Sequence, residues 1–108
     1  MNILAVKKNR FQMNELIEFF AGHDLFPAAT DTAAIRILKN TEIGLALVSI
    51  NNHSDFGLIR YINDNFKEIK VILSIRKEMQ VAFSVISSGR YNVIENPLKL
   101  KELRRVLK

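Results

Sequence analysis

Two kinds of hydrophobic pattern alternate along this chain: short continuous apolar runs, and apolar residues at helical spacing. The runs cover residues 3–6, 25–29, 43–50, 70–75 and 91–94, and each has the length of a strand. Apolar residues three or four positions apart predict helices over 13–20, 34–38, 58–66, 79–86 and 100–107. Strand and helix therefore alternate five times, which predicts a parallel sheet with helices on both faces.

The individual runs indicate where each strand lies in that sheet. The second run contains Pro27, and proline favours an edge strand because it has no N–H to donate. The third run, Ile43–Ile50, lacks polar alternation, as expected of a strand covered on both faces. With right-handed crossovers, these features predict an α/β flavodoxin-like fold of strand order 2-1-3-4-5. Ligands in such sheets bind beyond the carboxyl ends of the strands, here residues 7–10, 49–53, 74–77 and 95–97.

Length and composition narrow the class further. The 108 residues suit one domain, 1–108, and the absence of cysteine excludes disulfides and thiol chemistry. No apolar stretch reaches the length of a membrane span, and the first run is followed at once by Lys7 and Lys8, unlike a signal peptide. We expect a cytoplasmic protein.

The charge is basic, with a net charge of +5. Lysine and arginine are scattered along the chain without interleaved aromatic residues, so we do not expect nucleic-acid binding by this domain alone. No paired carboxylates, supported Ser/His/Asp set or glycine-rich phosphate loop is present, and we therefore expect no enzyme and no bound cofactor.

Several positions at the strand ends together resemble a known family. Residues 3–9 read ILAVKKN, and Gly57 follows Ser49 by eight positions. Ser74 lies in the segment VILSI, and Asn96-Pro97 comes after the last apolar run. Over essentially its full length, the chain resembles the receiver (CheY-like) domains of two-component response regulators. The resemblance implies a (βα)5 signalling module.

The residues that carry phosphorylation in that family are replaced here. Lys7 and Lys8 stand where receivers have an acidic pair, and Ser49 stands at the position of the phosphorylated aspartate. Val93 replaces the switch aromatic and Asn96 the conserved lysine, while Ser74 matches the family's hydroxyl. Receivers use Mg²⁺, a cation that binds carboxylate oxygens and that two ammonium groups would repel. The resemblance therefore implies a degenerate pseudo-receiver, without metal, that acts through protein contacts.

Other residues of these loops have plainer interpretations. Ser49 is expected to be inactive because no general base or metal is evident beside it. His53 and Asp55 lie in a polar loop that a solvated turn explains, and a lone aspartate is weak evidence for metal.

An alternative hypothesis is an anion or small-molecule sensor, in which Lys7, Lys8 and Arg76 make the strand-end pocket positive. The competing interpretation is that the lysines point into water, or that one lies across the vacant acid pocket.

The last two helices and the last strand form the usual contact face of receivers. In this chain the predicted fifth helix carries Lys101, Arg104, Arg105 and Lys108. The acids expected near it are Glu78, Glu95 and Glu102. These are too few to pair with the basic residues in a self-complementary, ion-paired homodimer. An acidic partner protein fits this face better.

Overall fold

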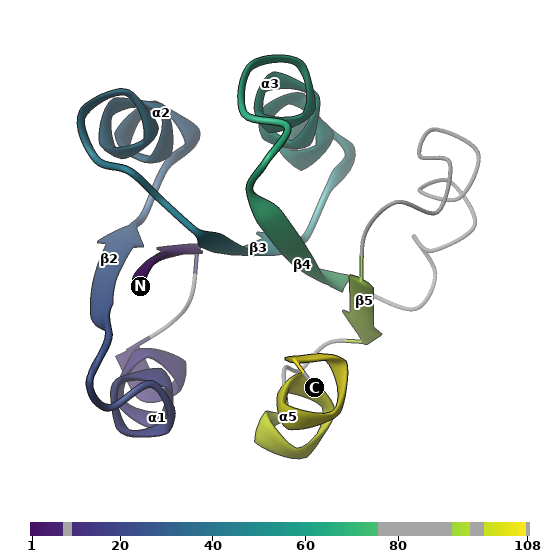
Figure 1. The fold of residues 1–108 in the computed structure, drawn as a ribbon. Coiled ribbons are helices and arrows are strands. Elements are labelled where there is room, and N and C mark those ends of the chain that lie inside the picture. The colour runs from purple at the N-terminus through teal and green to yellow at the C-terminus, as the bar shows by residue number, and fades with distance from the viewer. Residues whose placement is uncertain (8–9, 76–91, 96–98, 108) are drawn as a thin grey trace.

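Five parallel strands form one sheet in the computed structural model, which describes residues 1–7, 10–75, 92–95 and 99–107 (Figure 1). The strands are β1 (Asn2–Val6), β2 (Asp24–Ala28), β3 (Leu45–Ile50), β4 (Lys70–Ile75) and β5 (Asn92–Glu95). Their order is β2-β1-β3-β4-β5, so the predicted topology is confirmed. The described helices are α1 (Arg10–Phe19), α2 (Asp31–Asn40), α3 (Phe56–Asn65) and α5 (Leu100–Leu107). The helix predicted over 79–86 lies outside the described residues.

Helices cover both faces of the sheet, with α2 and α3 on one side and α1 and α5 on the other (Figure 1). Each face carries its own apolar core. Leu4, Val48 and Leu73 lie in the core beneath α2 and α3, whereas Ile3 and Leu47 lie in the core against α1 and α5. All six residues of β3 are buried, as the absence of polar alternation predicts for a central strand.

The edge position of β2 follows from its proline. Pro27 pairs in register with Ala5 of β1 and is exposed, so the edge predicted from this residue is confirmed. Strand β3 begins at Leu45, whereas the apolar run that predicts it begins at Ile43. Gly44 ahead of it donates its N–H to the carbonyl of Asn2 at 2.9 Å.

Register sets which residues meet at the carboxyl edge of the sheet. Val6, the last residue of β1, lies opposite Val48 of β3, and Ser49 lies opposite Ser74 of β4. Lys7 therefore leaves the sheet directly beside the end of β3.

None of the helices in the described part of the chain is long and apolar enough to cross a membrane.

The start of α2 is fixed by a side-chain cap. Thr30 has extended backbone angles, and its hydroxyl oxygen accepts the N–H of Ala33 at 3.1 Å. Such a cap satisfies one of the free N–H groups of the first helical turn. Thr30 is therefore the cap, and Asp31 is the first helical residue.

We predict that Thr30→Ala lowers the free energy of unfolding by about 1 kcal/mol, because the capping oxygen is lost. Urea unfolding measures the change. Thr32→Ala, at an exposed position inside the same helix, is the matched control and should cause no loss. Equal losses in both variants would contradict the capping role.

Candidate functional site

Lys7 occupies the centre of the carboxyl edge, immediately after β1. Its φ angle is +60°, a left-handed conformation that non-glycine residues rarely adopt and that costs on the order of 1 kcal/mol. The backbone N–H of Lys7 donates to the carbonyl of Ala28 at 2.8 Å, which holds the strained residue against β2. The turn directs the side chain into the pocket, where 23% of it remains exposed.

A buried carboxylate meets this lysine from the loop after β3. Asp55 ends the short 3-10 turn His53–Asp55, directly before α3, and only 3% of its side chain is exposed. One carboxylate oxygen accepts the backbone N–H groups of Asn51 at 2.7 Å and Asn52 at 3.1 Å. The other oxygen accepts a hydrogen bond from the Lys7 ammonium. Both oxygens of this buried charge are thereby satisfied.

Asp31 supplies a second carboxylate to the same ammonium. As the first residue of α2, it follows the end of β2, the neighbour of β1 in the sheet. Its Oδ1 lies 3.0 Å from Nζ of Lys7. This oxygen is buried, and the ammonium meets it as an ionic contact without hydrogen-bond alignment. We call Lys7, Asp55 and Asp31 the ion triad; it links the ends of β1, β2 and β3.

The contacts of the triad outweigh the effect of burial on two pKa values. Burial disfavours the charged form of each group, but the hydrogen bond to Asp55 and the negative charges of Asp55 and Asp31 raise the pKa of Lys7. Burial likewise opposes ionisation of Asp55, yet the Lys7 ammonium and the two backbone N–H groups hold the pKa of Asp55 below its usual value. The lysine is therefore charged and the aspartate ionised at neutral pH.

Two serines lie beside the triad in the sheet. Ser49 and Ser74 are register partners in β3 and β4, and they are 5% and 1% exposed. The phosphoacceptor-equivalent Ser49 is thus a buried strand residue. Val93 lies opposite Leu73 and is half-buried against the core below α2 and α3.

The remaining predicted pocket residues, Lys8, Arg76 and Asn96, lie outside the described residues. So does most of the predicted partner face, apart from β5 and α5. The backbone of His53 is in the 3-10 turn, and its side chain is not described.

The two carboxylates of the triad are not among the site residues predicted from the sequence. The sequence predicts a solvated turn around Asp55, and it assigns no site role to Asp31. A signal existed for Asp31, because β2 was placed beside β1 and its carboxyl end had to adjoin Lys7. The burial of Asp55 had no such signal, since it depends on how the loop after β3 folds back under α3.

The triad bears directly on the anion-sensor alternative. Lys7 was expected to add positive charge to the pocket, but it lies against two carboxylates. Its charge is therefore compensated within the protein, and it offers little attraction to a bound anion. Among the described residues, no group of three histidine, aspartate or glutamate side chains could hold a metal ion.

Several solved structures similar to this chain are described as response regulators or their receiver domains. The chain is similar to a two-component transcriptional regulator AraC from Clostridium phytofermentans ISDg, with 17% sequence identity and a TM-score of 0.85, covering 100% of this chain and 90% of that one. It is also similar to a CheY-like response regulator receiver domain from Methanospirillum hungatei JF-1, with 20% identity and a TM-score of 0.79 over 98% and 89% of the two chains.

A third similar structure is a response regulator receiver protein from Pseudomonas putida, with 21% identity and a TM-score of 0.79 over 98% of this chain and 93% of that one. No protein-family model and no curated protein matches the sequence. The class is nevertheless defined: this chain has the CheY-like α/β fold of a receiver domain.

We predict that Lys7→Ala lowers the free energy of unfolding by about 2–3 kcal/mol, since it leaves the Asp55 carboxylate buried without its cation. The figure lies below the loss of roughly 3–5 kcal/mol for fully buried pairs because Lys7 is partly exposed. Lys39→Ala, which removes an exposed lysine of α2, should change stability by less than about 0.5 kcal/mol. Equal effects in the two variants would show that the triad is not stabilising.

The triad also predicts how stability depends on pH. Because the folded pKa of Asp55 is lowered, its contribution is present above the unfolded pKa of about 4 and is lost as the pH falls through the folded pKa. Because the folded pKa of Lys7 is raised, its contribution is present below the unfolded pKa of about 10.4 and is lost as the pH rises further.

Denaturant unfolding across pH checks this dependence. Below pH about 4, the wild type should lose stability more steeply than Asp55→Asn, which has no carboxylate to titrate there. Parallel acid limbs for the two proteins would refute the assignment.

Proposed function

We propose that this chain is a receiver-like signalling module that works without phosphorylation and acts through protein–protein contact. The observation that carries the proposal is the ion triad, in which Lys7 places a permanent cation at the carboxyl edge of a receiver fold. The similar structures support a role in two-component-type regulation. The module is proposed to have no enzymatic activity of its own.

The first support is electrostatic. A divalent cation would need free carboxylate oxygens. In this pocket, Asp55 already gives its oxygens to Lys7 and to two backbone N–H groups, and Asp31 faces the same ammonium. A metal ion would have to displace the lysine from both carboxylates and would meet its positive charge while doing so.

The second support is the acceptor position. Ser49 has a hydroxyl where a receiver has a carboxylate, so an acyl phosphate cannot form there. The residue is also only 5% exposed, which limits access for an incoming phosphoryl donor. Serine would need a base to become a nucleophile, and the nearby Asp55 is engaged with Lys7.

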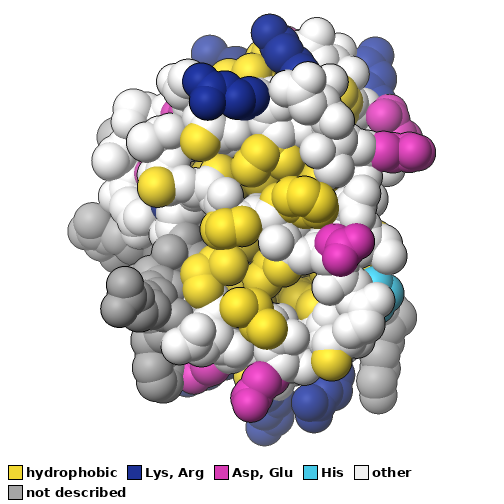
Figure 2. Space-filling model, turned by 90° about the vertical axis from the view of Figure 1, so that its left-hand side faces the viewer, with side chains coloured by type: hydrophobic (Ala, Val, Ile, Leu, Met, Phe, Trp, Pro, Cys, Tyr) yellow, Lys and Arg dark blue, Asp and Glu magenta, His cyan; other side chains and the backbone are white. Residues whose placement is uncertain are grey.

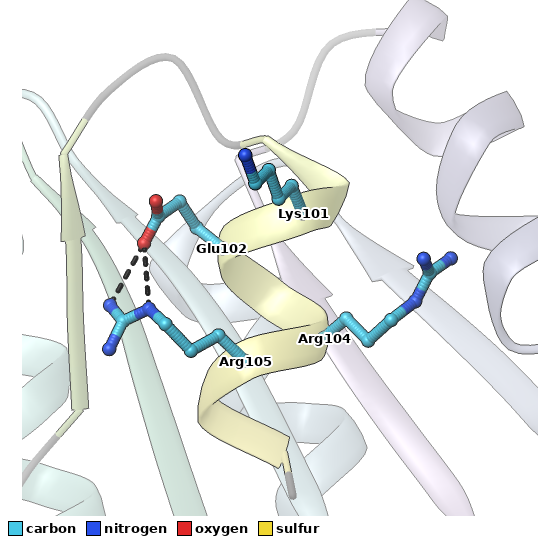
Figure 3. Close-up of a pocket in the computed structure, with 4 residues that line it drawn as sticks. All are labelled: Lys101, Glu102, Arg104 and Arg105. Carbon is cyan, nitrogen blue, oxygen red and sulfur yellow. Dashed lines mark hydrogen bonds and ion pairs between the residues drawn. The ribbon is translucent and has the colours of Figure 1, made fainter.

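The third support concerns the contact face. Helix α5 is strongly amphipathic, with Leu103 buried and its basic residues exposed. Figure 3 shows Glu102 and Arg105 paired on one side of the helix, at 2.8 Å, while Lys101 and Arg104 point elsewhere. These four residues line a shallow hollow of about 320 Å³.

The charge of this hollow favours an acidic partner. Arg105 is compensated by Glu102, and Arg104 lies over the ring of Phe19 of α1, 5.7 Å from its centre. The three basic residues exceed the one acid, so the helix surface stays positive. An acidic protein surface would be attracted to it.

We predict that the protein remains unmodified after incubation with acetyl phosphate and Mg²⁺, and that beryllofluoride with Mg²⁺ leaves its NMR spectrum unchanged. Intact-mass spectrometry checks the first result. A phosphorylatable receiver domain in the same incubation is the positive control. A stable adduct that maps to Ser49 and disappears in Ser49→Ala would contradict the proposal.

A further inference from the structure

The open edge of the sheet carries an apolar area that no other element of the described chain covers. Figure 2 shows hydrophobic side chains gathered in the middle of this face, which is the side of β2, α1 and α2. Ile17 of α1 is 56% exposed, and Pro27 of β2 is exposed beside half-buried neighbours. We call this surface the edge patch and define it by the exposed Ile17 and Pro27 and by their partly buried apolar neighbours on β2, α1 and α2: Met13, Leu25, Phe26, Ala33 and Ile37.

Contacts elsewhere on the two helices fix the direction in which their apolar flanks point. Phe19 of α1 lies under Arg104 of α5, so Ile17, about 200° away around the helix, lies on the flank turned from α5. Asp31 of α2 reaches inward to Lys7, so Ala33, again about 200° away, lies on the opposite flank. Both apolar flanks therefore border the open strand β2.

The backbone of β2 is unsuited to pairing with another strand. Asp24 donates its N–H to Met1, and Ala28 accepts from Lys7, so these residues hydrogen-bond toward β1. By the alternation of a strand, Leu25 and Pro27 direct their backbone groups outward. Pro27 has no N–H, which blocks extension of the sheet by an added strand. A partner here would have to pack its side chains against the patch.

The charges that flank the patch differ in sign on the two helices. On the α2 side, Arg36 is exposed one turn from Ala33, and Figure 2 shows basic side chains along the upper rim. On the α1 side, Glu18 is exposed, and the lower rim in Figure 2 shows acidic side chains together with basic ones. Arg36 beside α2 and Glu18 beside α1 thus carry opposite charges on the two sides of the patch. A surface that complements itself is what a two-fold symmetric contact needs.

We propose that the edge patch binds a second copy of this chain. The two-fold axis runs parallel to the strands, so that α1 of each copy faces α2 of the other. Glu18 then approaches Arg36 of the second copy twice per dimer, and the two copies of Ile17 and Pro27 lie in the apolar middle. This interface is separate from the basic hollow of α5, which stays open to an acidic partner in the same dimer.

Sedimentation equilibrium over a protein concentration series tests the proposal on the full chain. The wild type should show a monomer–dimer equilibrium. Ile17→Asp should weaken association about tenfold or more, because it places a charge in the apolar middle. This side chain is exposed in the monomer, so circular dichroism and thermal unfolding should show that the variant still folds.

Charge reversal tests the orientation of the two copies. Glu18→Arg alone and Arg36→Glu alone should each weaken association about threefold to tenfold, and the double variant should restore it. Arg60→Glu, the same reversal on exposed α3, is the matched control and should leave association unchanged.

Three results would overturn the dimer: a monomer at every concentration, association that Ile17→Asp does not affect, or single reversals that the double variant fails to rescue. The last would show that α1 and α2 do not face each other. Binding of an acidic peptide to α5, followed separately by NMR, is independent of these outcomes.

Discussion

The buried carboxylate of Asp55 requires a cation, and the pocket of this protein is arranged around that requirement. Removing a carboxylate from water is costly unless it is paired and hydrogen-bonded. Two backbone N–H groups and the Lys7 ammonium meet that cost here. Lys7 follows β1, and its ammonium also contacts Asp31 at the start of α2. These contacts join the ends of three strands and stabilise the left-handed turn at Lys7.

This arrangement inverts the charge relationship implied for a phosphorylatable receiver. There, carboxylates of the protein recruit a metal ion from solvent; here the protein's own ammonium occupies the carboxylates. A metal ion exchanges with solvent and so makes a pocket responsive, whereas a lysine side chain is covalently retained. With Ser49 and Ser74 buried side by side, the pocket is organised as a structural junction. Of the surfaces in the described residues, we propose the exterior of α5 and the open edge of the sheet for contacts with other chains.

The CheY-like scaffold tolerates this change because its stability lies elsewhere. Two apolar cores, one on each face of the sheet, are built from strand residues such as Leu4, Leu47 and Leu73. These side chains do not reach the carboxyl edge, where loop residues supply the chemistry. Fold and site can therefore diverge, as the low sequence identity to similar receiver structures illustrates.

The sequence by itself determined the five-fold alternation, the strand order and the edge position of β2, because periodicity and Pro27 act through local backbone rules. The resemblance to receivers also led to the expectation that the acidic pair and the acceptor aspartate are replaced, by Lys7, Lys8 and Ser49. Only the tertiary structure decided that Lys7 is an internal counterion. Its partners, Asp31 and Asp55, lie 24 and 48 positions after it in the sequence. Only sheet register and loop folding bring these charges together.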